Sequence, residues 1–229
     1  MNKILIETVK VKKTYQHFSG KITLFNNLNL KIKQGDLVAL VGPSGSGKSS
    51  LLHLLALLDE PTSGDIKIND ILTRKITDEK KDETRRKNIS IIFQDNNLLN
   101  DFSAIENVMM PLIIKGENEM NAKKEAQKIL KAVKIFDRAQ HFPNELSGGE
   151  QQRVAIARAL IAGTNLILAD EPTGNLDYKT SKEIFSYFLK LKKLKKTIIF
   201  ATHNRELANR ADYKLLISNG DIKRVNARW

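Results

Sequence analysis

The sequence of 229 residues contains no cysteine. This absence excludes disulfide bonds and thiolate metal sites, and it fits a reducing compartment. Long apolar runs are missing as well. In residues 1–15 the longest apolar run is Ile4–Ile6, which is too short for a signal peptide. The longest later stretches, Leu51–Leu58 and Val108–Ile114, fall far short of the roughly 20 apolar residues of a membrane-spanning helix. We therefore expect a soluble cytoplasmic protein.

Acidic residues are too few to balance the basic ones, and the formal net charge is +12. Such an excess can indicate binding to nucleic acid or to an anionic membrane surface. Here the lysines are spread over several segments, among them 123–134 and 190–196, which we interpret as outer faces of helices. The pattern therefore favours lysine-rich, solvated helix faces. Attraction to anionic lipid headgroups is the second interpretation.

Hydrophobic periodicity predicts an α/β core that is interrupted by a helical insert. The expected strands cover 4–11, 24–32, 37–41, 66–68, 89–93, 166–169 and 198–201. Turns are expected at 15–20 and 61–64, and helices at 48–58 and around 184–191. From 95 to 162 the pattern is mostly helical, with one apolar face formed by Ala122, Ala126, Ile129, Leu130 and Val133. We expect one compact unit, with core residues 1–94 and 163–229 and helical residues 95–162.

A glycine-rich loop lies between the expected strand 37–41 and the expected helix 48–58. Its residues, Gly42–Ser49, fit the phosphate-loop pattern G-x-x-x-x-G-K-[ST], in which glycines let backbone N–H groups wrap around a phosphate. Lys48 would reach the β- and γ-phosphates, and the Ser49 hydroxyl would bind Mg²⁺. A plain glycine turn is the alternative, which the strand–loop–helix context disfavours. The predicted nucleotide-binding residues are Gly42, Pro43, Ser44, Gly45, Ser46, Gly47, Lys48, Ser49 and Ser50.

Two carboxylates follow the apolar run Leu166–Ala169. Ligands of open α/β sheets bind at the carboxyl ends of the strands, so Asp170 and Glu171 are predicted to lie beside the phosphate loop. Asp170 is suited to holding Mg²⁺ through water, and Glu171 to polarising an attacking water as a general base. A strand that simply ends at the surface is the alternative, which the pairing with Gly42–Ser49 disfavours.

A second glycine loop, Leu146–Arg153 with the sequence LSGGEQQR, also leads into an expected helix. Free backbone N–H groups and the helix dipole make such a helix start an anion-binding site, even without a lysine. The candidate phosphate contacts are Ser147, Gly148, Gly149 and Glu150. The phosphate loop with Lys48 already provides one anion-binding site, so the sequence pattern alone does not explain why the chain has a second one.

With Gly42–Ser49, Leu146–Arg153 and Asp170–Glu171 together, the chain resembles the nucleotide-binding subunits of ABC transporters over essentially its whole length. The resemblance implies an α/β P-loop NTPase fold, in which a mixed-sheet core carries an N-terminal antiparallel β subdomain and an inserted α-helical subdomain. It also implies a homodimer with ATP and Mg²⁺ sandwiched between two head-to-tail chains. There the Leu146–Arg153 loop of one chain closes over the ATP of the other, which explains the second cradle.

The resemblance also assigns roles to further positions. Tyr15 is similar to the aromatic residue that stacks on adenine, and the alternative for a lone tyrosine is core packing. Gln94 is similar to the glutamine that contacts Mg²⁺ and senses the membrane partner. Asp177 resembles the loop residue that communicates across the dimer, and His203 the histidine that contacts the γ-phosphate. The expected catalytic residues are Lys48, Gln94, Glu171 and His203.

Stretches around 51–65, 98–112 and 168–177 resemble one branch of the family, which contains lipoprotein-releasing (LolD-type), macrolide-exporter and cell-division ATPases. The lipoprotein-releasing type resembles the chain most. It implies an ATPase at the cytoplasmic face of the bacterial inner membrane that binds integral permease subunits and handles the lipoprotein only indirectly. A cell-division ATPase that signals to wall hydrolases and a macrolide-exporter ATPase are the alternatives.

The permease contact is expected around Gln94 and 96–110, with Phe102, Val108 and Met109 exposed for it. Core packing is the alternative for each side chain, and it is favoured for Val108. A soluble ABC ATPase that acts on nucleic acid is a further class. Members of that class usually carry two ATPase units in one chain or long coiled-coil insertions. This chain has one unit and no long heptad run, so no nucleic-acid partner is expected.

Overall fold

The computed structural model describes residues 3–18, 20–174 and 176–226. The strands are β1 (Ile4–His17), β2 (Gly20–Lys33), β3 (Leu37–Val41), β4 (Ser63–Ile68), β5 (Ile71–Leu72), β6 (Ile89–Ile92), β7 (Leu166–Asp170), β8 (Thr197–Ala201), β9 (Tyr213–Ser218) and β10 (Asp221–Asn226). The helices are α1 (Lys48–Leu55), α2 (Asp78–Asn88), α3 (Ala104–Ile114), α4 (Glu119–Ala132), α5 (Gly148–Ile161), α6 (Tyr178–Lys193) and α7 (Arg205–Ala208). Short 3₁₀ turns lie at Thr73–Lys75, Phe136–Arg138 and Pro143–Glu145.

These strands form two sheets. The central sheet has the order β10-β9-β3-β8-β7-β6, in which only the β9–β10 pair is antiparallel among the described strands. The second sheet, β2-β1-β4-β5, is antiparallel. Strands β7 and β8 are buried along their whole length, which explains their continuous apolar sequences. The predicted mixed-sheet core with an antiparallel β part is therefore confirmed.

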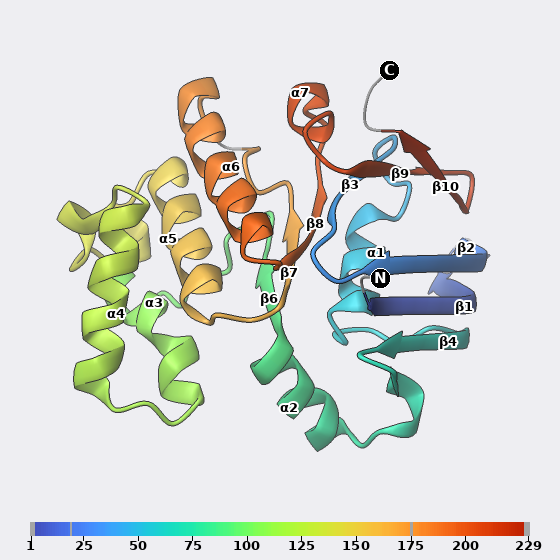
Figure 1. Cartoon of the computed structure of the whole chain (residues 1–229), viewed down its shortest axis with the longest axis horizontal. Helices are drawn as coiled ribbons and strands as arrows, with labels where there is room; N and C mark the ends of the chain where they lie inside the picture. Colours follow the sequence, from blue (N-terminus) through green and yellow to red (C-terminus); the bar gives the residue numbers. More distant parts are fainter. Residues whose placement is uncertain (1–2, 19, 175, 227–229) are drawn as a thin grey trace.

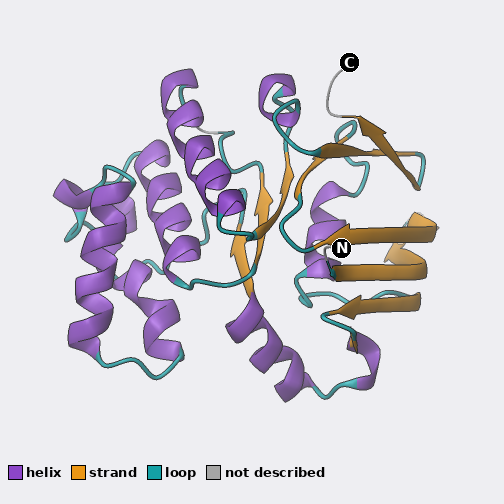
Figure 2. Ribbon diagram, in the orientation of Figure 1, coloured by secondary structure: helices purple, strands orange, loops and turns teal. Residues whose placement is uncertain are grey.

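Helices cover both faces of the central sheet (Figure 2). On one side α1 lies between this sheet and the antiparallel one, and on the other α5 and α6 pack against it (Figure 1). The aromatic rings of Phe185 in α6 and Phe200 in β8 meet edge to face, with centroids 5.3 Å apart. Ile184, Phe185 and Phe188 are fully buried, as the periodicity of this helix predicts. The central sheet is thereby held rigidly between two apolar layers.

A third apolar cluster joins α3, α4 and α5 at one end of the molecule (Figure 1). The face of α4 that carries Ala122, Ala126 and Leu130 is buried there. Val108 and Met109 of α3 belong to the same cluster and are 0% and 6% exposed. The core packing favoured for Val108 is therefore confirmed, and the expected exposure of Met109 to a permease is wrong, because both side chains fill the space between the three helices. Phe102 precedes α3 and keeps 37% of its surface exposed.

Local structure differs from the predictions at several places, and β5, β9 and β10 are absent from the expected strands. The strand β1 continues to His17, so the expected turn at 15–20 is confined to the connection between β1 and β2. The helix expected at 48–58 ends at Leu55. The polar helix α2 is not predicted at all, because its sequence DEKKDETRRKN lacks apolar periodicity. It begins at the N-cap Thr77 and contains the ion pairs of Glu83 with Lys80 and Lys87, each at 2.6 Å.

The substitution Phe200→Ala tests the packing of the central sheet. We expect it to lower the free energy of unfolding by about 3–5 kcal/mol, because it leaves a cavity between β8 and α6. Urea unfolding monitored by circular dichroism measures this change. Phe18→Ala is the control at a fully exposed aromatic side chain, with an expected change within about 0.5 kcal/mol. Equal effects of the two substitutions would contradict the assigned core.

Candidate active site

The phosphate loop connects the end of β3 to the start of α1. Gly45 and Gly47 have φ values of 75° and 98°, in the left-handed region that glycine adopts without a steric penalty. Gly42 is required for a different reason. A Cβ at this position would lie 2.3 Å from the carbonyl oxygen of Ile217 in β9. The loop therefore lies tightly against the sheet, as a backbone cradle for phosphate requires.

Lys48 lies across this loop. It is 7% exposed, and its Nζ donates hydrogen bonds of 3.0 Å to the carbonyl oxygens of both Gly42 and Pro43. Gly47 offers no side-chain cap to the first turn of α1, and the buried Ser46 Oγ has no hydrogen-bond partner within the described residues. Uncapped backbone N–H groups, an unpaired hydroxyl and an ammonium group form a donor set that suits phosphate.

A cavity of about 300 Å³ joins the phosphate loop to four other segments, one of which is β2 with Leu24. Its lining residues are Leu24, Ser44, Gly45, Gly47, Lys48, Ser49, Ser50, Gln94, Asp170, Glu171 and His203. The groups outside the loop follow or end β6, β7 and β8, which run parallel to β3. The structure thus brings into one cavity the predicted metal-binding and catalytic residues and most of the predicted phosphate loop, while Gly42, Pro43, Ser46 and Tyr15 are not among the lining residues.

Glu171 and His203 contact each other at the edge of this cavity. Oε1 of Glu171 lies 3.4 Å from Nε2 of His203, and Oε2 accepts a hydrogen bond from the His203 backbone N–H at 3.4 Å. Glu171 has a φ of 45°, which is costly for a residue with a side chain and typical of functional sites. Burial raises the pKa of Glu171, and the proximity of His203 opposes this effect. A carboxylate with a raised pKa is a suitable acceptor for a proton from water.

Oxygen donors for a magnesium ion also line the cavity. The Ser49 hydroxyl, the Gln94 side chain and the Asp170 carboxylate come from three different segments. Within the described residues, no cluster of three or more histidine or acidic side chains could hold a metal by itself. Mg²⁺ prefers oxygen ligands and is commonly bound by one or two carboxylates together with phosphates and water. The donor set therefore fits a magnesium ion that arrives with a nucleotide.

The second glycine loop lies outside this cavity. Ser147 is exposed and caps α5, while the Glu150 carboxylate accepts hydrogen bonds from the Ser147 backbone N–H and hydroxyl, both at 2.8 Å. These bonds lower the pKa of Glu150, which also pairs with Arg138 at 3.1 Å. Gly148 is exposed and Gly149 is half-buried. The start of the 14-residue helix α5 is thus exposed at the surface and does not face the phosphate loop of the same chain.

The remaining predicted residues lie around these two sites. Asp177 caps α6 by accepting a hydrogen bond from the Thr180 backbone N–H at 3.0 Å, and its neighbour Asn175 lies outside the described residues. Tyr15 lies on β1 with 37% of its surface exposed. Gln94 lies in an exposed turn after β6.

Sequence reasoning missed the side chains that hold two of these residues in place. Lys13 and Asp59 contact Tyr15. Arg158 in α5 donates hydrogen bonds of 2.7 Å to the carbonyl oxygens of Asn96 and Asn97, next to the Gln94 turn. These contacts connect residues that are distant in the sequence, so local patterns could not reveal them. The one signal in the sequence was that Asp59 belongs to a stretch that resembles family members.

No helix in the described ranges is both long and apolar enough to cross a membrane.

Known proteins resemble the chain in sequence and in structure. A sequence model of the family described as "ABC transporter" matches residues 25–174. The "Lipoprotein-releasing system ATP-binding protein LolD" of Rickettsia bellii is 48% identical over 220 residues, covering 93% of this chain and 96% of that protein. The protein of the same name from Legionella pneumophila is 41% identical over 223 residues, with 97% and 98% covered.

A solved structure, "Dimeric structure of a post-hydrolysis state of the ATP-binding cassette MJ0796 bound to ADP and Pi", matches with a TM-score of 0.94. It is 38% identical and covers 98% of this chain and 100% of that one. A "Dimeric Structure of MJ0796, a Bacterial ABC Transporter Cassette" matches equally well. These similarities extend over nearly the whole chain and include the phosphate loop, the carboxylates and the second glycine loop. The chain therefore belongs to the ABC transporter family, as an ATP-binding subunit of the LolD type.

Proposed function

We propose that the chain hydrolyses ATP as the nucleotide-binding subunit of a lipoprotein-releasing system, and that two copies hold the ATP between them. The observation that carries this proposal is the separation of two phosphate-binding helix starts. One opens into the cavity with Lys48, and the other, at Ser147, is exposed outside it. A second copy in head-to-tail orientation brings its Ser147 to the open side of the cavity and completes the site.

Within each site the residues have distinct roles. The phosphate loop and Lys48 bind the β- and γ-phosphates, and Tyr15 stacks on the adenine. When bound, Mg²⁺ neutralises charge on the phosphates, and Ser49, Gln94 and Asp170 would hold it. Glu171 accepts a proton from the water that attacks the γ-phosphate.

His203 and the second copy complete this arrangement. His203 holds the Glu171 carboxylate and lies beside the γ-phosphate. The α5 helix start of the second copy donates hydrogen bonds to the same phosphate. The phosphate replaces the Glu150 carboxylate as the acceptor for Ser147, and Arg138 retains Glu150 through their ion pair. Asp177 communicates between the two sites. Loss of the γ-phosphate on hydrolysis removes these contacts and releases the dimer.

Release of lipoproteins from the inner membrane toward the outer membrane is the proposed output. The relatives from Rickettsia bellii and Legionella pneumophila carry a name that describes this system, and neither the cell-division nor the macrolide-exporter alternative is favoured. The chain would work peripherally at the cytoplasmic face, where its Gln94 turn and the exposed Phe102 contact integral permease subunits. The lipoprotein is handled by those permeases and only indirectly by this chain.

Purification from native membranes tests this output. We expect the tagged chain to bring with it permeases that have large external domains, together with trapped lipoproteins, as identified by mass spectrometry. A membrane partner linked to wall hydrolases instead would contradict the output and leave the ATPase chemistry unchanged.

Glu171→Gln tests the general base. The substitution should lower ATP hydrolysis about 10²–10⁴-fold, because the amide cannot accept the proton. ATP binding should persist, and size-exclusion chromatography with Mg-ATP should show a trapped dimer. Glu206→Gln, which alters an exposed carboxylate paired with Lys182, is the control and should hydrolyse ATP normally. A strictly monomeric Glu171→Gln variant at saturating Mg-ATP would count against the sandwich.

Ser147→Arg tests the contribution of the second copy. Hydrolysis should fall about 10²-fold or more, because a donor to the transferred phosphate is lost. Binding of Mg-ADP to the isolated chain should stay at the wild-type value, since Lys48 of the same chain is unaffected. Asn118→Arg is the matched control, because it also removes the cap of a helix, α4, and adds an arginine. It should hydrolyse ATP normally, and loss of ADP binding in Ser147→Arg would contradict the division between copies.

A further inference from the structure

Asp59 connects the proposed adenine-stacking residue to the segment that follows α1. The hydroxyl of Tyr15 donates a hydrogen bond of 2.6 Å to Oδ2 of Asp59, across 44 positions of sequence. The other carboxylate oxygen, Oδ1, accepts hydrogen bonds from Nζ of Lys13 at 2.6 Å and from the backbone N–H of Glu60 at 2.7 Å. Burial, together with the hydrogen bond to Asp59, raises the pKa of Tyr15, so its hydroxyl remains a donor. One carboxylate therefore fixes the outer end of the Tyr15 side chain.

Lys13 occupies one face of the Tyr15 ring. Its Nζ lies 4.5 Å from the ring centre and donates a further hydrogen bond to the carbonyl oxygen of Glu60 at 2.8 Å. Lys13 is 8% exposed, and Asp59 and this carbonyl compensate the burial of its ammonium group, because a buried charge without partners is strongly unfavourable. With the ammonium group on one face, a base can stack only on the opposite face of the ring.

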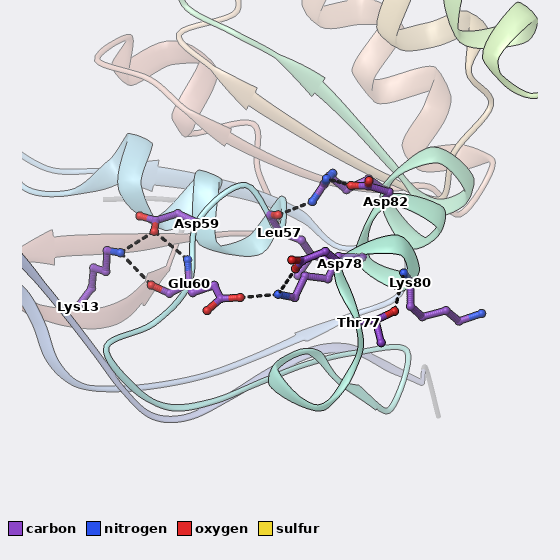
Figure 3. A network of polar contacts seen from close by, with 10 residues as sticks. Lys13, Leu57, Asp59, Glu60, Thr77, Asp78, Lys80 and Asp82 are labelled. Atoms are coloured by element: carbon purple, nitrogen blue, oxygen red, sulfur yellow. Dashed lines mark hydrogen bonds and ion pairs between the residues drawn. The ribbon is translucent and has the colours of Figure 1, made fainter.

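The segment that carries Asp59 is also held by α2 (Figure 3). Lys81 of α2 forms an ion pair with Glu60, and Arg85 donates a hydrogen bond to the carbonyl oxygen of Leu57. The side chain of Lys81 is only 14% exposed and that of Glu60 is 71% exposed, so this pair is shielded from solvent on the lysine side. The segment between Leu57 and Glu60 is thus fixed to α1 by the chain and to α2 by polar contacts.

We propose that Asp59 and Lys13 are positioning residues that hold the Tyr15 ring as a platform with a single open face for the adenine of ATP. This proposal rests on the stacking role given to Tyr15 above. Stacking on an aromatic ring depends on the orientation of its face. The hydroxyl is anchored at one end and the ammonium group blocks one face, so one orientation remains.

Comparison of Mg-ADP with Mg-pyrophosphate tests the positioning role. Both bind the phosphate loop and neither is hydrolysed at the γ-phosphate, so the ratio of their affinities isolates the contribution of the base. Calorimetry on the full chain measures both. Asp59→Asn and Tyr15→Phe should weaken ADP binding about three- to tenfold, a part of the stacking contribution, and leave pyrophosphate binding unchanged. Equal weakening of both ligands would indicate a structural role and overturn the proposal.

Asp212→Asn is the matched control. Asp212 also pairs with a lysine, Lys192, and accepts a backbone hydrogen bond of 2.9 Å from Leu37. Leu37 is the first residue of β3, at the opposite end of this strand from the phosphate loop. The control should bind both ligands as the wild type does. Should Asp59→Asn fail to fold, Tyr15→Phe decides the question, because it removes only the hydroxyl.

Tyr15→Ala separates the two proposals. If this variant binds ADP as tightly as the wild type, the stacking role is wrong and the positioning role is wrong with it. If Tyr15→Ala weakens ADP binding alone while Asp59→Asn and Tyr15→Phe match the wild type, only the positioning role is overturned. A selective loss of ADP affinity in all three variants supports both.

Discussion

The parallel alignment of β3, β8, β7 and β6 is the constraint on which the active site depends. Parallel strands present their carboxyl ends at one edge of a sheet, so the loops after them meet however far apart they are in sequence. The register places Ala201 of β8 opposite both Leu40 of β3 and Asp170 of β7, so three strands end at one level. The residues proposed as phosphate donors, metal ligands and general base thereby converge on one cavity, and the apolar layers on both faces hold the sheet in place.

Two helix starts use the same electrostatics with different local partners. The start of α1 has a glycine at its N-cap and a lysine across its loop, so its free donors are available to a phosphate of the same chain. The start of α5 is closed by the capping box of Ser147 and Glu150. There the Glu150 carboxylate accepts the hydrogen bonds of the Ser147 backbone N–H and hydroxyl. This asymmetry agrees with the proposed site, which two copies would complete and which would open again when the γ-phosphate leaves.

The polar network around Asp59 has a geometric rather than an energetic role. Exposed ion pairs such as those of Glu83 in α2 contribute little to stability, typically about 0–1 kcal/mol each. The side chains of Lys13 and Lys81 are only 10% and 14% exposed, and their contacts restrict where the segment between Leu57 and Glu60 can lie. A helix with no apolar face is thus retained at the edge of the molecule, next to the antiparallel sheet that carries Tyr15. The base and the phosphates of a nucleotide would then meet groups at fixed separations.

The sequence alone determined the phosphate loop, the carboxylates after β7, the second glycine loop and the apolar strands, because each is a local pattern whose spacing carries its own chemistry. It also indicated the family and the buried face of α6. Only the tertiary structure decided that Met109 is buried, that α2 is a helix, and that Asp59 holds Tyr15. Burial and long-range polar contacts depend on side chains from segments that are distant in the sequence. A local sequence pattern does not specify which of these segments will pack against it.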